Sequence, residues 1–201
     1  MSKTPTILTT EETERILNAI RFPKGPRTQT MQSYRNYLCC LFMLDAGLRV
    51  SEVIQLKRFM LWKDGQVVSS LSVPAEIAKL HRSRIIPMSE ALRDEIIFMH
   101  DNVWINLPEA SLGYVFHSGG YQKHITARRI QQVISQAGLA TIGRRVWPHV
   151  FRHSFANRLM RVTNIRVVQE LLGHKNLTST QIYTHPNSQD LLKAITAIKE
   201  T

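Results

Sequence analysis

The spacing of apolar residues predicts helices over most of the chain, and capping residues mark where several of them begin. Thr9 and Glu12 have the form of a capping box, which predicts a helix start at this point. A long apolar-rich helix is predicted over residues 30–46, ended by Gly47. Residues 22–28, which contain prolines and a glycine, are predicted to link these two helices.

The remaining helical stretches begin at residues that favour a helix N-terminus, and several end at a glycine. They cover residues 51–57, 89–100, 126–138, 148–160 and 164–173, a short helix that begins at Thr178 and carries Tyr183, and residues 188–198. In the last of these stretches, Leu191, Leu192, Ile195 and Ile198 are predicted to share one apolar face.

Strand signals are confined to the middle of the chain. Segments 59–62 and 66–73 flank a turn at residues 63–65, and 84–87 is predicted to form another strand. Residues 114–117 form either a short strand or an extended segment. The pattern predicts an α+β fold that is mostly helical, with one small antiparallel β-sheet and no internal repeats.

Positive charge is concentrated in the second half of the chain. The 201 residues carry a net charge of +11, and residues 121–201 hold 12 Lys and Arg against 3 Asp and Glu. This distribution favours a polyanionic partner, most simply nucleic acid, over a generic basic surface. The length suits one domain, and 43% hydrophobic residues suffice for a sizeable core.

The apolar segments argue against a membrane or secreted protein. No run reaches membrane-spanning length, and the first residues lack a signal-peptide core, so we expect a cytoplasmic protein with no membrane partner. Cys39 and Cys40 are adjacent in an apolar segment and lack metal-ligand spacing, so we interpret them as small buried hydrophobes.

Five residues suited to phosphodiester chemistry occur in three short motifs. Arg49 lies in AGLRVSE, His149 and Arg152 in HVFRHSFA, and His174 and Tyr183 in LLGHKNLTSTQIYTH. A phenol can be a nucleophile, guanidiniums can hold phosphate oxygens, and imidazoles can move protons. Taken alone, Arg49 is more typical of a surface position, His174 of a helix end and Tyr183 of half-buried packing, and His149 is as typical of a capping or core residue. The signal is therefore the ordered combination.

Local spacing supports two pairs within this set. His149 and Arg152 are three residues apart near a predicted helix start, so they share a face and could meet one phosphate. Glu52 follows Arg49 by three residues and could orient its guanidinium or a neighbouring base.

The order and separations of the three motifs resemble the tyrosine recombinase (phage integrase) family from about Thr9 to Ile198. The resemblance implies the catalytic-domain fold of that family and a site-specific DNA recombinase. Such an enzyme cuts and rejoins DNA through a 3′-phosphotyrosyl intermediate. It needs no metal ion, ATP or other cofactor, because the covalent link keeps the phosphodiester energy.

The resemblance also implies a role for each motif residue. Tyr183 would attack the scissile phosphate, while Arg49 and Arg152 would bind its non-bridging oxygens. His149 would accept or donate a proton near the nucleophile, and His174 would hydrogen-bond the phosphate.

The family uses a hairpin lysine as general acid for the 5′ oxygen, and Lys79 in AKLHRSRIIPM matches that segment. The family usually has Gly-Lys-Gly, whereas this chain has Ala78-Lys79-Leu80, which restricts the turn. Lys79 could instead be a solvated hairpin residue. Arg82 and Arg84 are nearby candidates for phosphate contacts.

A basic helix precedes the His149 motif, at the place where the family inserts a helix into the major groove. Arg128 is the candidate for a base-edge contact, and Arg129 or Lys123 for phosphates. The alternative is an exposed helix whose arginines meet only solvent.

The predicted organisation is an N-terminal tail over residues 1–8, a catalytic domain over 9–187, and a C-terminal helix over 188–201. That helix either docks on another subunit or folds back on its own domain. Family members usually carry a further helical domain, so the chain is either a short member or a fragment. The expected partners are double-stranded DNA, further copies of the same chain in a homotetramer on DNA, and accessory DNA-bending proteins.

Three other functions remain open at this point. A catalytically silent DNA-binding regulator could keep the fold, and a type IB topoisomerase uses similar chemistry without strand exchange. A basic ribosomal or chromatin protein would explain the charge but not the motifs. Among recombinases, integration, excision, inversion and resolution use the same residues.

Overall fold

Helix α2 (Met31–Asp45) is the centre of the fold, because the apolar residues of its second half are buried around its whole circumference. Leu38, Cys39, Cys40, Phe42 and Met43 are all at most 1% exposed, as expected for a helix buried on all sides. The prediction that the two cysteines are buried is confirmed, and burial raises the pKa of both thiols.

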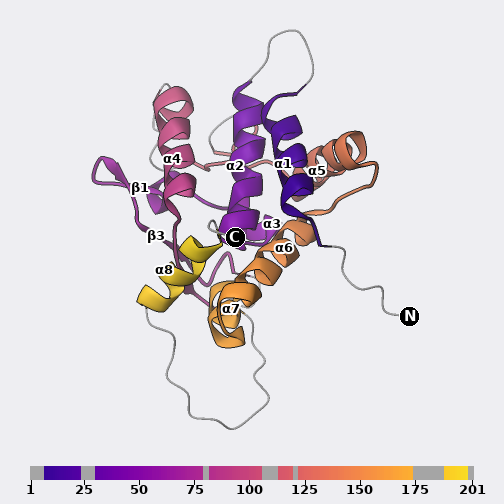
Figure 1. Cartoon of the computed structure of the whole chain (residues 1–201). Coiled ribbons are helices and arrows are strands. Elements are labelled where there is room, and N and C mark those ends of the chain that lie inside the picture. Colours follow the sequence, from indigo (N-terminus) through magenta and orange to yellow (C-terminus); the bar gives the residue numbers. More distant parts are fainter. Residues whose placement is uncertain are drawn as a thin grey trace.

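The computed structural model describes residues 7–23, 30–78, 82–105, 113–119, 122–173 and 188–198. Helices α1 (Thr10–Arg21) and α5 (Ala127–Ile142) pack together on one side of α2, and α4 (Glu90–Met99) lies on the other (Figure 1). Helix α6 (Pro148–Val162) packs against α2 near α7 (Ile165–Leu172).

Side-chain caps begin several of the helices at the predicted residues. Thr9 and Glu12 form the full capping box, with Glu12 N to Thr9 Oγ1 at 3.1 Å and Thr9 N to Glu12 Oε2 at 3.0 Å. The side chains of Thr30, Thr126 and Asn164 cap α2, α5 and α7 by accepting a hydrogen bond from a backbone N–H of the first turn. The starts of these helices are therefore local properties of the sequence.

The predicted end of α5 at Gly138 is wrong, since the helix continues to Ile142 and ends at Gly143, where φ is +70°. Gly138 is instead a point of close approach. A Cβ atom there would lie 2.7 Å from Val146 Cγ2 and 2.9 Å from the Arg144 carbonyl oxygen. The glycine lets the returning chain pack directly on α5.

The helix predicted over 51–57 is a single turn, α3 (Val50–Val53), and Ser51 lies inside it rather than at its cap. Arg49 holds the cap position because its backbone N–H donates to Glu52 Oε2 at 2.8 Å. The following residues tighten into a short 3-10 helix, η1 (Arg58–Met60).

The described part of the chain contains two small antiparallel sheets instead of the single predicted one. Strands β1 (Trp62–Lys63) and β2 (Gln66–Val67) form a short hairpin, while β3 (Ser70–Val73) pairs with β4 (Arg84–Pro87). The first hairpin is short because η1 takes residues 59 and 60 of the predicted strand 59–62.

Two neighbouring segments depart slightly from prediction. Helix α4 continues into a π-helical turn, η2 (His100–Trp104), which buries Trp104. Residues 114–117 form no regular strand: Tyr114 and His117 make isolated antiparallel bridges to Lys57 and His124, with a turn at Val115 and Phe116 between them. The prediction of a short strand or extended segment is therefore wrong for the two central residues.

Helix α8 (Ser188–Ala197) packs against β4, α6 and α7 of the same chain (Figure 1). Leu191 and Ile195 are buried in this contact. Leu192 is 46% exposed, so its predicted place on the buried face is wrong. Its position next to Leu191 turns it away from the face that Leu191 and Ile195 share.

Replacing Gly138 by Ala should lower the free energy of unfolding by about 1–3 kcal/mol, the usual range for overpacking. The added methyl group would meet a backbone carbonyl, which cannot rotate away as a side chain can. Chemical denaturation would measure the change. Leu139→Ala, at the exposed neighbouring position, should change stability far less, and equal effects would contradict the close-approach explanation.

Candidate active site

Gly47 joins three segments of the candidate site. Its φ is +61°, and a Cβ atom there would lie 2.5 Å from the ring of Phe155 and 2.9 Å from Leu172 Cδ2. The missing side chain therefore lets α6 and the end of α7 approach the turn that carries Arg49. The Gly47 carbonyl also accepts a hydrogen bond from Arg152 Nη1.

Glu52 is a fully buried carboxylate on which several cationic groups converge. Arg84 binds it with two nitrogens, Nη2 to Oε2 at 2.8 Å and Nη1 to Oε1 at 3.2 Å. Arg49 donates its backbone N–H at 2.8 Å and its Nη1 at 3.1 Å. Arg152 Nη1 lies 3.9 Å from Oε2. The prediction that Glu52 orients the Arg49 guanidinium agrees with this geometry.

Arg152 extends from α6 into the same buried site. Besides Gly47, it binds the Leu172 carbonyl through Nη2 at 2.6 Å. Its side chain is 10% exposed, while that of Arg49 is 21% exposed. Both guanidiniums are thus held by protein acceptors and retain limited access from the surface.

The site carries more positive than negative charge, because guanidiniums from Arg49, Arg84 and Arg152 meet one carboxylate. Burial and then the charge of Arg49 lower the pKa of Arg152 to about 9. Burial alone would raise the pKa of Glu52, but the hydrogen bonds and charge of Arg84 outweigh it and lower that pKa. An anion entering the site would offset the excess positive charge.

A pocket of about 410 Å³ opens at this cluster and is lined by Arg49, His149, Arg152 and His153 among others. His149 is the second residue of α6, so it lies at the positive end of that helix. His153 was missed by the sequence reasoning, although it follows His149 by four residues on one helix face. Its ring centroid lies 5.9 Å from that of His149, and burial, then His149, lowers its pKa.

The structure thus brings together Arg49, His149 and Arg152, three of the six residues predicted to be catalytic. Lys79, His174 and Tyr183 lie outside the described residues. In the sequence, Ala78 precedes Lys79 directly, and Leu172, which lines the pocket, precedes His174 by two positions.

Arg84 does not have the position that a phosphate contact needs, so that prediction is wrong. Its side chain is 3% exposed and its guanidinium is bound to Glu52 and to the Leu171 carbonyl. Strand pairing with β3 turns Arg84 inward, whereas Ile85 is 62% exposed.

The other predicted DNA contacts lie on the surface. Arg82, Lys123, Arg128 and Arg129 are exposed, and Arg82 lies 3.6 Å from Glu170. Arg128 lines a hollow along the outer side of α5. The hollow also includes Gln131, Gln132, Ser135, Gln136, Leu139, Arg145 and Trp147.

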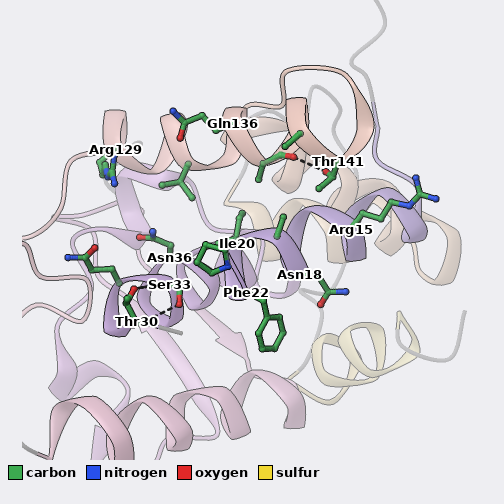
Figure 2. A pocket seen from close by; sticks show the side chains of 16 residues that line it. Arg15, Asn18, Ile20, Phe22, Thr30, Ser33, Asn36, Arg129, Gln136 and Thr141 are labelled. Atoms are coloured by element: carbon green, nitrogen blue, oxygen red, sulfur yellow. Dashed lines mark hydrogen bonds between the residues drawn. The ribbon is translucent and has the colours of Figure 1, made fainter. Parts of the chain in front are cut away.

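A larger hollow, of about 980 Å³, lies between α1, α2 and α5 (Figure 2). Arg129 and Gln136 line it from α5, and Arg15 and Phe22 from α1 and its end. Arg49, Glu52, His149 and Arg152 are not among its lining residues. Size alone therefore does not locate the chemistry, and the convergence of charged groups is the better guide.

Within the described ranges, no group of three His, Cys, Asp or Glu side chains could hold a metal ion. Among the helices described, none is both long and apolar enough to span a bilayer.

Comparison with known proteins identifies the family of this chain. A sequence profile for the phage integrase family matches residues 6–190, and the chain belongs to that family. Tyrosine recombinase XerC from Pseudomonas aeruginosa is 35% identical over 154 residues, which cover 73% of this chain and 46% of that protein. The chain spans about half the length of the curated relatives it matches.

Solved structures confirm the predicted fold. The crystal structure of XerA recombinase has a TM-score of 0.66 and 26% identity, over 97% of this chain and 66% of that chain. XerH site-specific recombinase, bound to a palindromic difH substrate in a post-cleavage complex, has a TM-score of 0.60 and 25% identity. That match covers 99% of this chain and 54% of that chain.

Glu52→Gln should lower the free energy of unfolding at neutral pH by about 3–5 kcal/mol, because it leaves buried guanidiniums without their carboxylate. The lowered folded-state pKa means that Glu52 contributes stability above about pH 4.5, which is lost as pH falls through the folded-state value. Chemical denaturation at several pH values would measure this. As the pH falls, the free energy of unfolding should decrease more in the wild type than in Glu52→Gln, because the variant has no carboxylate to protonate at this position.

The matched control is Glu170→Gln, since Glu170 faces the exposed Arg82. A surface pair of this kind contributes up to about 1 kcal/mol. If the two variants were equally stable, Glu52 would not be the main ion-pair acceptor of the fold.

Proposed function

We propose that this chain is the catalytic domain of a site-specific DNA recombinase that cuts and rejoins strands through a 3′-phosphotyrosyl intermediate. The observation that carries the proposal is the excess of buried guanidinium charge around Glu52, opening into the pocket with His149. A phosphodiester is an anion of suitable size and charge for two partly accessible guanidiniums.

Arg49 and Arg152 are proposed to bind the two non-bridging oxygens of the scissile phosphate. Charge on these oxygens grows as the nucleophile attacks, so preorganised guanidiniums stabilise the transition state more than the ground state. Glu52 and backbone carbonyls already hold both groups, so little reorganisation is needed during the reaction.

The remaining steps follow the family resemblance of the motifs. Tyr183 would attack the phosphorus and form the phosphotyrosyl bond, while Lys79 would protonate the departing 5′ oxygen. His149 would take the phenolic proton, and His174 would donate a hydrogen bond to the phosphate. In the second half-reaction, the 5′ hydroxyl of a partner strand attacks this bond and releases Tyr183.

Double-stranded DNA is the proposed partner, and the XerH site-specific recombinase is bound to a palindromic difH substrate in its solved complex. The exposed Arg128 on α5 is proposed to contact a base edge, with Lys123 and Arg129 on phosphates. We further propose the domain division stated above and assembly as a homotetramer on DNA.

Two alternatives are separable by experiment. A catalytically silent regulator would bind DNA without forming a covalent adduct, and a type IB topoisomerase would relax a plasmid that lacks any specific site. The presence of Arg49, His149, Arg152, His174 and Tyr183 in the sequence favours an active enzyme over a silent one.

Tyr183→Phe should abolish the SDS-resistant adduct that the wild type forms with a nicked duplex from the DNA flanking its native gene, while leaving DNA affinity unchanged. Removal of the phenolic oxygen removes the nucleophile. Arg152→Lys should slow adduct formation by roughly 100–1000-fold, the usual effect of losing one transition-state donor. The control is Tyr114→Phe, which should react at the wild-type rate; adduct formation by the Tyr183 variant would refute its role.

Arg128→Ala should weaken binding to the preferred duplex by about 1–3 kcal/mol and relax the preference at one base pair. Lys123→Ala should instead weaken binding to all duplexes alike and reduce the salt slope by about 1. Binding titrations at several salt concentrations, with single base-pair changes, would compare the two variants. Identical patterns would show that Arg128 does not read a base.

A further inference from the structure

Arg84 is a buried guanidinium that connects two separate parts of the chain. It donates two hydrogen bonds to Glu52, at 2.8 and 3.2 Å, and its Nε donates to the Leu171 carbonyl at 3.1 Å. The planar fork of arginine fits a carboxylate in two-point contact, and a lysine cannot reproduce this geometry.

Each end of this connection also holds an arginine of the candidate active site. Glu52 accepts hydrogen bonds from Arg49, and the end of α7 accepts one from Arg152 through the Leu172 carbonyl at 2.6 Å. The relative positions of Arg49 and Arg152 therefore depend on the two anchors that Arg84 joins.

The end of α7 is shaped to receive Arg84. Gly173 has φ of +64°, and a Cβ atom there would lie 3.2 Å from Arg84 Cδ. The chain thus crosses the Arg84 side chain closely at the residue before His174. Arg84 therefore lies against Gly173, the residue after which the segment with His174 and Tyr183 begins.

We propose that Arg84 is a positioning residue, which holds Glu52 and the C-terminal end of α7 together so that Arg49 and Arg152 bind the same phosphate. The proposal rests on the function proposed above. Arg84 itself does not touch DNA in this arrangement, because its contacts are all with the protein interior.

Arg58 provides a matched control for the loss of a buried arginine. It is 3% exposed, and it donates to the Trp104 carbonyl at 3.4 Å. Within the described part of the chain, its Nε and Nη2 have no hydrogen-bond partner. Arg58→Met therefore removes a similar side chain without altering the contacts of Glu52.

The test is a double-mutant cycle with Arg84→Met, Glu52→Gln and the double variant, alongside Arg84→Lys and Arg58→Met. Covalent adduct formation is measured on a nicked duplex that the wild type cleaves, well below the lowest melting temperature. A second readout is the rise in melting temperature when inorganic sulfate replaces chloride at equal ionic strength. Arg58→Met corrects for the general stabilisation by sulfate.

Arg84→Met should slow adduct formation on the order of 100-fold, as expected when catalytic groups shift by about 1 Å. The double variant should react no more slowly than the slower single variant, because both act through one carboxylate. Arg84→Lys should remain slow, and Arg58→Met should react at the wild-type rate. The sulfate-dependent rise should shrink in Arg84→Met but not in Arg58→Met.

Three results would overturn the proposal: equal rates for Arg84→Met and Arg58→Met, multiplied effects in the double variant, or full rescue by lysine. If the wild type formed no adduct with any duplex, the proposed recombinase function would fail instead. The sulfate measurement would then test the role of Arg84 separately. If sulfate raised the melting temperature of Arg84→Met as much as that of the wild type, Arg84 would not position the anion site.

Discussion

Glu52 has no contact with solvent, and a carboxylate in that position must be balanced by cations from the protein itself. Arg49 comes from the same turn, Arg84 from β4 and Arg152 from α6, so one ion-pair cluster joins three parts of the chain. The carbonyls of Gly47, Leu171 and Leu172 complete the arrangement. Glu52 and these three carbonyls together connect the turn, the second sheet and helices α6 and α7.

The same cluster carries an excess of positive charge that suits the proposed binding of an anion. One carboxylate cannot neutralise three guanidiniums, and the pKa of Arg152 is lowered by burial and by the charge of Arg49. Such an excess of buried positive charge is unfavourable in a purely structural interior, whereas it favours the binding of an anion. The phosphate proposed to bind there would supply the missing negative charge. Stability and function are thus coupled through the same few side chains.

Parts of the fold and of this site could be predicted from sequence because they involve residues close together along the chain. The capping box of Thr9 and Glu12 depends on a spacing of three residues, and so does the contact between Arg49 and Glu52. The end of α5 could not be predicted in this way. Gly138 resembles a helix terminator in sequence, but it is a packing glycine because Arg144 and Val146 return against it.

The sequence by itself determined the order of the helices, most of their capped starts, the basic second half and the motif residues of the proposed chemistry. Only the tertiary structure decided that Arg84 is a buried support rather than a DNA contact, and that His153 shares the pocket with His149. The reason is physical. Caps are satisfied within one turn of helix, whereas the burial of Arg84 depends on Glu52 and Leu171, which are 32 and 87 residues away.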